Sequence, residues 1–489
     1  MKRTVSILLS LLMLLPSMAA CGESRENADS SPIPAVTTEE GQPGAEDAEP
    51  AAEEDAIPAP DIPADADFGG ADFTVIYPNW SLYEHYLSAE ELNGEVVNDA
   101  MVNRNQTVDD LLGVNITFIT KGYIDTILTE VKNAVSAGDG TYDMAVTHCI
   151  NGLQGLLQGG LIYDWNKIPY VDLTKPYWNQ SILEQLTIGG KTPFAAGDLL
   201  IADPNVIWFN NDIATESNIG NIYETVLNGT WTVDTMIDLC DRVIVDLNGD
   251  GKMTAKDQYG VCGNDGWPVI SFMYGCDQYV AEFVDGRPQV ALQTEKAAGV
   301  VEKFYKLFCE GDRALVNSSV NDRYIPFETY HALFYFMSLS SMEQYRTTEV
   351  DYGIIPFPKY DENQEEYVSL NWTGLQCVPV SCRDKEMVGM VAEELGYESK
   401  KQVLPAYFEN LLDGKIARHE ETRQMLDIIF DTSVYDFGMN FSNQANFLYI
   451  LPDLMRAKST DLASNLQKNM KVTVKVYDKI VKAYEDLGE

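Results

Sequence analysis

DFTVIY, from Asp72 to Tyr77, is a run of β-branched and aromatic residues after a glycine pair, and it predicts a β-strand. Apolar residues at helical spacing over 95–112 predict a helix after it. A strand at 114–119, a helix near 124–137 and a strand at 142–147 are predicted next. Alternation of this kind predicts parallel strands joined by helical crossovers, in an α/β sheet covered on both faces.

Further elements are predicted beyond this first unit. Gly113 is expected to end the first helix in a C-cap position. The later sequence predicts strands at 205–209, 352–355 and 375–380, and helices at 232–245, 297–307, 327–337 and 463–487. About 420 residues beyond Gly70 are too many for one ordinary core, so we expect two lobes.

Candidate ligand contacts follow two of the predicted strands. Ligands of open α/β sheets sit beyond the carboxyl ends of the strands. Trp80 follows the strand at 72–77, and His148 and Asn151 follow the strand at 142–147. Each has a structural alternative, because Trp80 fits a surface or core aromatic, His148 a hydrogen-bonded structural histidine, and Asn151 a helix cap.

The first residues have the layout of an export signal. Lys2 and Arg3 precede an apolar run at 5–15, and Ser17-Met18-Ala19-Ala20-Cys21 ends the segment with small residues before a cysteine. This ending resembles the bacterial lipobox. We therefore expect residues 1–20 to be a signal peptide and Cys21 to carry a lipid, with simple secretion as the alternative. A retained transmembrane helix is disfavoured, because the apolar run is shorter than the ~20 residues that span a bilayer.

Residues 21–70 are expected to form a disordered tether rich in Pro, Ala, Asp and Glu. Residues 22–70 hold 14 acidic side chains and the single basic residue Arg25, and a segment with so few large apolar residues cannot offset its ordering entropy. The tether carries about a third of the net charge of −41. The rest lies on the folded part, which argues against nucleic acid or an anionic lipid surface as the ligand.

The cysteines point to no metal site. Seven follow Cys21, with no C-x-x-C spacing and no histidine at metal-ligand spacing, so we expect mostly reduced thiols and leave a Cys262–Cys276 disulfide open. The four histidines are scattered, and the motifs of serine hydrolases, P-loop enzymes and zinc proteases are absent from the sequence. We therefore do not expect an enzyme.

Short motifs in a consistent order resemble the extracellular solute-binding proteins of ABC transporters, in the family-1 group that mostly handles carbohydrates. They cover nearly all of the chain after Gly70. The motifs are Gly94 to Ala100 with Arg104-Asn105, Tyr142-Asp143, Pro176 to Gln180, Gly197-Asp198, Phe209 to Asn211, Gly353 to Tyr360, and Met425 to Ile429.

This resemblance implies a periplasmic-binding-protein-like fold (type II) of two α/β lobes, with mixed sheets flanked by helices and a hinge between the lobes. The lobe limits follow by placing that fold on this chain. The amino-terminal lobe is expected at 71–196 plus 375–400, the carboxyl-terminal lobe at 203–368 plus 407–489, and the hinge segments near 197–203, 369–374 and 401–407.

Aromatic side chains are the expected ligand contacts. Their faces can lie against the C–H faces of a pyranose while polar side chains bond its hydroxyls. The tryptophan candidates are Trp80, Trp178, Trp267 and Trp372, of which Trp372 is best placed at a presumed crossing. Trp208 fits a core position better. Asp198 could accept bonds from ligand hydroxyls, with hinge support as the equal alternative.

Residues 246–257 resemble an EF-hand calcium loop. A glycine, Gly251, stands at position 6, where it permits the sharp turn of the loop. The expected ligands at positions 1, 3, 5, 7, 9 and 12 are Asp246, Asn248, Asp250, Lys252 through its carbonyl, Thr254 and Asp257. We expect a structural Ca²⁺, bound weakly because Asp257 is shorter than the usual glutamate. A metal-free turn is the alternative.

The sequence thus predicts a monomeric receptor that is lipid-anchored to the outer face of a bacterial cell membrane. It is expected to capture a small solute, most simply a sugar or oligosaccharide, and to deliver it to the permease subunits of an ABC transporter. Two alternatives stay open. One is a surface lipoprotein enzyme acting on glycans, and the other is a receptor of the same fold for a peptide or another solute.

Overall fold

The computed structural model describes residues 57–80, 86–321, 325, 329–345, 348–412, 420–442 and 447–488. The expected signal peptide, the lipidated Cys21 and the tether up to residue 56 lie outside the described residues. Ile57, Ile62 and Phe68 pack against the first hydrophobic core cluster. The packed chain therefore begins earlier than the Gly70 boundary expected from composition, because these apolar residues contact the hydrophobic core.

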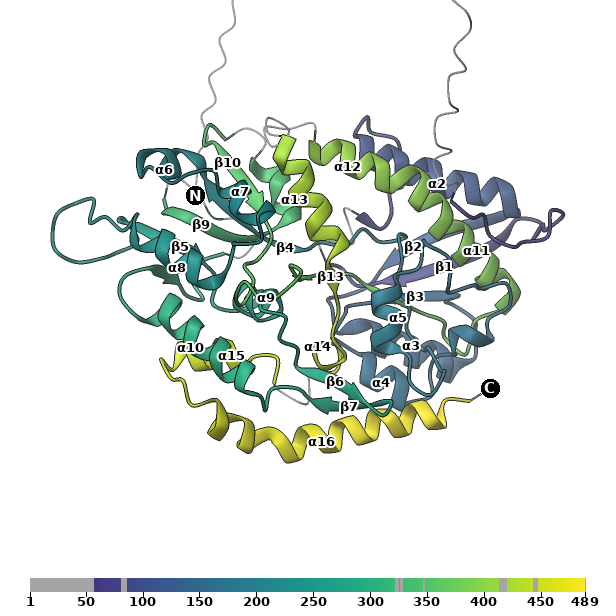
Figure 1. The fold of residues 1–489 in the computed structure, drawn as a ribbon. Coiled ribbons are helices and arrows are strands. Elements are labelled where there is room, and N and C mark those ends of the chain that lie inside the picture. The colour runs from purple at the N-terminus through teal and green to yellow at the C-terminus, as the bar shows by residue number, and fades with distance from the viewer. Residues whose placement is uncertain are drawn as a thin grey trace, which may run out of the picture. The chain divides into compact units, whose positions relative to one another are not determined.

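The first sheet has the strand order β12-β3-β1-β2 (Figure 1). Strands β1 (Ala71–Tyr77), β2 (Val114–Thr120) and β3 (Met144–Thr147) are parallel, as predicted. The fourth strand, β12 (Leu375–Cys377), returns from far along the chain and pairs antiparallel with β3. A sheet with both parallel and antiparallel neighbours results.

Helices α2 (Val96–Leu112) and α3 (Thr126–Ala137) connect the parallel strands β1, β2 and β3. Helices α4 (Leu153–Gln158) and α5 (Gln180–Leu186) follow β3. Helix α2 ends as expected at Gly113, whose φ of 61° lies in the left-handed region that glycine adopts without strain. Arg104 of α2 is fully buried and donates to the carbonyl oxygens of Leu87 and Leu199 at 2.8 and 3.3 Å.

The second sheet has the strand order β10-β4-β9-β5-β8. Its strands are β4 (Asn205–Asn210), β5 (Gln258–Gly263), β8 (Ala314–Val316), β9 (His331–Ser338) and β10 (Tyr352–Ile355). Strand β4 is antiparallel to β9 and β10, whereas β5 is parallel to β8 and β9. Strand β9 lies where a helix was expected at 327–337, so that prediction is wrong for its described residues. Six of its eight residues are fully buried, because it is a central strand covered on both faces.

Helices pack around the second sheet, and a hairpin contacts α14 (Phe437–Asn440) and α16 (Leu462–Asp486) instead. The helices are α6 (Asn211–Glu216), α7 (Ile222–Leu227), α8 (Val233–Asp241), α9 (Trp267–Gly275), α10 (Glu295–Cys309) and α15 (Ile450–Arg456), and the hairpin is β6 (Ala281–Val284) with β7 (Arg287–Val290). Thr294 and Thr232 cap α10 and α8 through their side-chain oxygens, which accept from the amides of Ala297 and Thr235.

The crossings between the sheets lie side by side. The Asp203 amide donates to the Trp372 carbonyl at 2.9 Å, which joins the first two expected crossings. Strand β11 (Ser369–Leu370) pairs in parallel with β13 (Ser433–Val434), so β13 runs beside the crossing at 369–374.

The third crossing is not at 401–407, where we expected it. These residues form part of a π-helical turn (Ser399–Val403) and the start of α12 (Leu404–Leu412), and both elements contact α2. They therefore belong with the first sheet and with α11 (Lys385–Glu398). The next helix, α13 (Glu420–Asp431), contacts β10 and α7 of the second sheet.

The last helix contacts both halves. The amino-terminal part of α16 (Leu462–Asp486) packs Leu462 and Leu466 into the core cluster of the second sheet. Its carboxyl-terminal part packs Tyr477 and Ile480 into the cluster that contains α4. In Figure 1 it runs along the lower edge of the view, beneath both sheets. We call it the strap helix. It was expected to belong to the second lobe alone.

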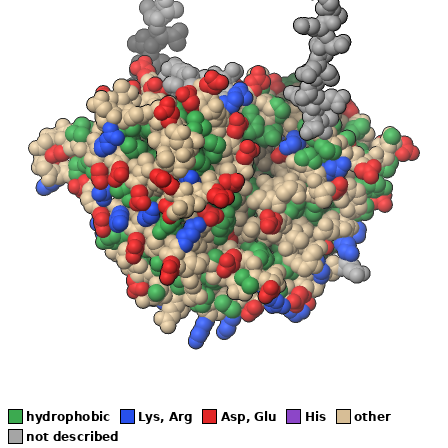
Figure 2. Space-filling model, viewed as in Figure 1, with side chains coloured by type: hydrophobic (Ala, Val, Ile, Leu, Met, Phe, Trp, Pro, Cys, Tyr) green, Lys and Arg blue, Asp and Glu red, His purple; other side chains and the backbone are tan. Residues whose placement is uncertain are grey.

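The face seen in Figure 2 carries charged side chains of both signs. Among the described residues, no helix has both the length and the apolar composition that a membrane crossing requires. Figure 2 shows acidic side chains spread over the viewed face and interspersed with Lys and Arg. The seven cysteines after Cys21 are all free thiols, so Cys262 and Cys276 form no disulfide.

Candidate functional site

Four of the seven predicted ligand contacts lie in one row of rings. The ring centroid of Trp80 is 4.7 Å from that of His148, which lies 6.5 Å from that of Trp372. Trp372 meets Trp267 edge to face at 4.2 Å, and Trp267 lies 5.5 Å from Tyr449. We call these five residues the aromatic row.

The fold explains why residues so distant in sequence meet. Trp80 and His148 follow β1 and β3, at the carboxyl edge of the first sheet. Trp267 begins α9, which follows β5 of the second sheet, and Pro268 occupies the first turn of that helix. Trp372 follows β11 on a crossing segment. The row therefore joins the carboxyl edges of both sheets, where α/β folds bind ligands.

His148 is held in one orientation. Its Nδ1 accepts a hydrogen bond from the Ile150 amide at 3.2 Å, and the Asn151 side-chain nitrogen lies 3.5 Å from the same atom. An amide donor requires a lone pair on Nδ1, so we infer a neutral imidazole with its proton on Nε2. Asn151 does not cap the following helix, because Gly152 is the N-cap residue of α4.

Trp178 lies in a different environment. It is 3 % exposed, its ring packs 5.4 Å from that of Trp165, and its Nε1 donates to Glu393 Oε1 at 2.7 Å. Tyr177 donates to the other oxygen of Glu393, whose pKa is raised by burial. These contacts are those of a core residue.

Asp198 lies at the first crossing in an ion pair. Lys400 Nζ is 3.2 Å from its Oδ2. Burial raises the pKa of Asp198, while the lysine opposes that rise. The pairing fits the hinge-support alternative, and it leaves the carboxylate with one charge partner already in place.

Tyr449 is the member of the row that sequence reasoning missed. It precedes α15, far along the chain from the other four residues, and is half-buried. It follows no predicted strand and belongs to none of the motifs above, so no local signal marked it.

In the predicted calcium loop, side-chain oxygens accept hydrogen bonds from backbone amides of the same loop. Asp246 accepts from the amides of Gly249 and Gly251 at 2.8 and 2.7 Å, and Asn248 and Asp250 accept from amides two residues on. Gly251 has the positive φ expected of it, 78°. Asp257 is buried, and its carboxylate accepts from the amides of Leu247 and Thr254.

The donor set of this loop fits calcium only in part. Asn248 and Asp250 are exposed and Asp246 is half-buried, whereas the Asp257 carboxylate is turned to the loop backbone. Among the described residues, no three carboxylate, imidazole or thiol groups converge well enough to hold a metal ion. A bound Ca²⁺ would therefore require Asp246 and Asp250 to move.

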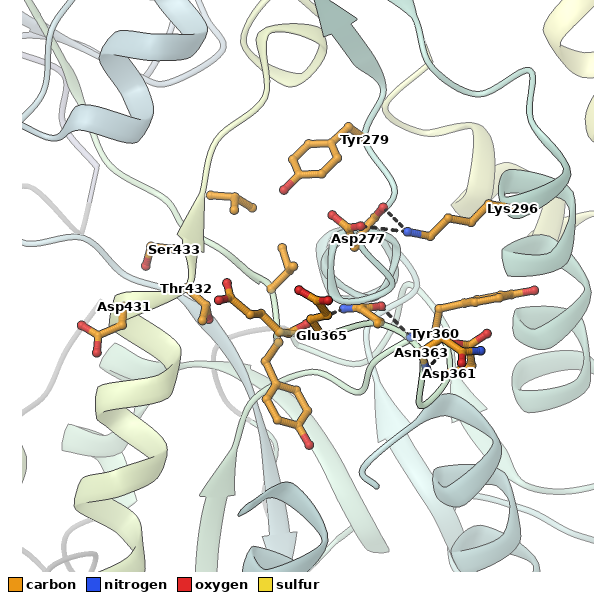
Figure 3. A pocket seen from close by; sticks show the side chains of 15 residues that line it. Asp277, Tyr279, Lys296, Tyr360, Asp361, Asn363, Glu365, Asp431, Thr432 and Ser433 are labelled. Carbon is orange, nitrogen blue, oxygen red and sulfur yellow. Dashed lines mark hydrogen bonds and ion pairs between the residues drawn. The ribbon is translucent and has the colours of Figure 1, made fainter. Parts of the chain in front are cut away.

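A polar hollow of about 720 Å³ lies beside β11 and β13. Figure 3 shows Lys296 pointing to Asp277, its ion-pair partner at 2.9 Å, across from Thr432 and Ser433. The lining also includes the carboxylates of Asp361, Glu365, Glu366 and Asp431. With its one lysine already paired, this hollow disfavours anionic ligands.

Comparisons with known sequences yield no relative. No family model matches the chain. No curated protein matches it.

Comparisons with solved structures do match. An ABC substrate-binding protein from Listeria monocytogenes in complex with cycloalternan is 9 % identical with a TM-score of 0.53, over 84 % of this chain and 98 % of that one. An ABC transporter solute-binding protein from Thermotoga lettingae bound with α-D-tagatose is 14 % identical with a TM-score of 0.51, over 84 % and 100 %. The GacH receptor of Streptomyces glaucescens, solved unliganded and with acarbose, is 12 % identical with a TM-score of 0.51, over 85 % and 98 %.

These likenesses span nearly the whole described chain at low identity, so they bear on the fold. The resemblance seen in the sequence motifs is confirmed at that level. The chain has the two-lobe α/β fold of the solute-binding proteins of ABC transporters.

Proposed function

We propose that this chain is the exported, lipid-anchored solute-binding protein of an ABC transporter, and that it captures a neutral sugar or oligosaccharide between its lobes. The structures it resembles are binding proteins whose descriptions name cycloalternan, tagatose and acarbose. At this identity the likeness supports the class of ligand without selecting one member of it.

The aromatic row is the observation that carries the proposal. It draws Trp80 and His148 from the first sheet and Trp267 and Tyr449 from the second, with Trp372 between them. A ligand that touches both ends of the row gains contacts only when the lobes are together, so it favours the closed state. Aromatic faces with a few polar groups suit a polar, uncharged ligand.

The charges near the row also favour a neutral solute. His148 is uncharged, and Asp198 is already paired with Lys400 at 3.2 Å. A charged ligand would be buried without a free counter-charge from these groups, which is costly. This argument favours a sugar over the charged end of a peptide.

Delivery and anchoring belong to the same proposal. Cys21 would carry the lipid, the tether would let the folded part reach a permease, and the closed lobes would present the docking surface. We further propose that residues 246–257 bind a structural Ca²⁺, with Asp246 and Asp250 turning from backbone amides to the ion. The two proposals stand independently.

The test is a thermal-shift and calorimetric screen of the purified protein with cycloalternan, D-tagatose and acarbose, followed by chromatography of the recovered sugars. We expect at least one sugar to raise the Tm and to be recovered unchanged. New reducing ends would show an enzyme instead. No response to these sugars, together with a Tm rise from peptides, would overturn the choice of ligand.

A further inference from the structure

Two buried oxygen atoms near the aromatic row have no hydrogen-bond partner within the described part of the chain. They are the Tyr435 hydroxyl and Asn440 Oδ1. Tyr435 is 2 % exposed and Asn440 is 1 % exposed. Buried polar atoms are nearly always satisfied by protein, water or ligand, because leaving one unpaired is costly. Each of these atoms is therefore expected to bond a partner other than the described protein groups.

Each residue is linked to a member of the aromatic row through that member's neighbour in sequence. Tyr435 directly follows β13, whose Val434 carbonyl accepts from the Asn371 amide at 3.4 Å, one residue before Trp372. Asn440 ends α14 (Phe437–Asn440), and its Nδ2 donates to the Cys149 carbonyl at 2.7 Å, one residue after His148.

The two residues are close to the same neighbours. Burial raises the pKa of the Tyr435 hydroxyl, and electrostatic interactions with Cys149 and Asp198 add to that rise, so Tyr435 lies near both residues. Asn440 bonds Cys149 directly. The segment 435–440 therefore lies against the chain just past β3, where Cys149 follows His148 of the row.

We propose that Tyr435 and Asn440 hydrogen-bond hydroxyl groups of the bound solute from the crossing side of the aromatic row. This inference rests on the proposed function and deepens it, because it adds two residues that would select among solutes. The rings would pack against the apolar faces of the sugar, and these two oxygens would hydrogen-bond its hydroxyls.

The chemistry of the two atoms favours an alcohol. Since Asn440 Nδ2 is already engaged, Oδ1 is left to accept a bond, and the Tyr435 hydroxyl can donate or accept. A carboxylate has no proton to give Asn440. An ammonium group could donate to both, but the nearby Asp198 is already neutralised by Lys400. A neutral hydroxyl satisfies both atoms without burying an unpaired charge.

The test compares two tyrosine-to-phenylalanine substitutions. Tyr435→Phe removes the hydroxyl beside the row. Tyr477→Phe is the matched control, because the Tyr477 hydroxyl on α16 is also buried without a partner in the described structure, while its ring packs against Phe437 at 5.2 Å. Neither substitution deletes a hydrogen bond between described residues, so the Tm of the sugar-free proteins should stay close to that of the wild type.

The dissociation constant is then measured by calorimetry, using whichever of cycloalternan, D-tagatose or acarbose gives the wild type its largest Tm rise. We expect Tyr435→Phe to weaken binding by about tenfold or more and Tyr477→Phe to leave it within about twofold. Asn440→Ser serves as a second variant and should also weaken binding. A deoxy analogue that binds the wild type and Tyr435→Phe equally well would identify the hydroxyl that Tyr435 contacts.

The outcomes separate this inference from the function on which it rests. If the wild type binds one of the sugars and both Tyr435→Phe and Asn440→Ser bind it as tightly, buried water satisfies the two oxygens and the inference is overturned, while the proposed function stands. If the wild type binds none of them, the proposed function fails and the inference fails with it.

Discussion

The indole rings of Trp267 and Trp372 meet edge to face, with centroids 4.2 Å apart and ring planes at 80°. Trp267 is fixed to the second sheet through α9, whereas Trp372 lies on a crossing whose carbonyl accepts from the Asp203 amide of another crossing. The contact thus ties one lobe to the segment about which lobes of this fold would turn. A solute that inserts along the row would meet both rings.

Substitutions at opposite ends of the row should weaken sugar binding separately. Trp80 and Trp267 are both half-buried, so replacing either with alanine removes ring surface without emptying a fully packed core. We expect Trp80→Ala and Trp267→Ala each to raise the Kd about tenfold or more, or about 1.4 kcal/mol, measured by calorimetry.

Trp178→Phe is the control for this pair. Trp178 is buried and bonds Glu393, so its replacement should lower the Tm and leave the Kd unchanged. If Trp178→Phe weakens binding as much as Trp267→Ala does, the aromatic row is not the sugar site.

The part of the site that the sequence predicted is the part that local patterns encode. Strand-forming runs before Trp80 and His148 place both residues at the carboxyl edge of a parallel sheet, independently of how the rest of the chain folds. Trp372 was expected near a crossing because of the family resemblance, and it lies shortly after β11. Local order along the chain was sufficient to place Trp80 and His148.

Other features depend on tertiary contacts that no local pattern carries. The apolar run at 331–338 fits a buried helix or a buried strand equally well, and only its pairing with β4 and β5 decides for the strand. Trp178 looked like Trp267 in sequence but meets the buried Glu393, which lies more than 200 residues away. Tyr449 reaches the aromatic row from a segment with no motif.

Glu394 makes the stability of the protein depend on pH. This side chain of α11 is 7 % exposed, and burial, followed by the charge of Glu398, raises its pKa to about 7. Because the folded protein holds this proton more tightly than the unfolded chain, protonation favours folding. This contribution to the free energy of unfolding is fully present below about pH 4.5 and is lost as the pH rises through 7.

Glu394→Gln should therefore stabilise the protein at alkaline pH. We expect a gain of about 1–3 kcal/mol near pH 8 and little change near pH 5, followed as Tm in matched buffers. Glu386→Gln, at an exposed carboxylate of the same helix, is the control and should shift the Tm equally at both pH values. A pH-independent gain for Glu394→Gln would contradict this account.

Calcium should stabilise the protein if residues 246–257 bind it. At about a hundredfold excess over the Kd, a ligand of the folded state adds about 2.7 kcal/mol, and a chelator removes it. Asp246→Ala should abolish the Tm rise caused by Ca²⁺, because Asp246 would be the first ligand of the proposed loop. Asp285→Ala, at an exposed carboxylate in the β6–β7 turn, should keep it. If neither Ca²⁺ nor a chelator changes the Tm, the segment is a metal-free turn and the calcium proposal is wrong.

The strap helix gives a prediction with an internal control. Tyr484 is 1 % exposed, and its hydroxyl donates to the Leu186 carbonyl at the end of α5 at 2.8 Å, which fastens the carboxyl-terminal part of α16 to the first lobe. The Tyr477 hydroxyl, two turns earlier on the same helix, is buried without a partner in the described structure. Tyr484→Phe therefore deletes a hydrogen bond and Tyr477→Phe does not.

The difference should show in local opening rather than in global unfolding. A net hydrogen bond contributes about 1 kcal/mol, so Tyr484→Phe should speed amide hydrogen exchange in the last turns of α16 about fivefold, measured by mass spectrometry. Tyr477→Phe should leave exchange unchanged. Lys191, which donates to the Leu487 carbonyl at 2.7 Å, gives a second way to loosen the same end through Lys191→Met. If Tyr484→Phe and Lys191→Met both leave exchange at the wild-type rate, apolar packing alone holds the strap in place.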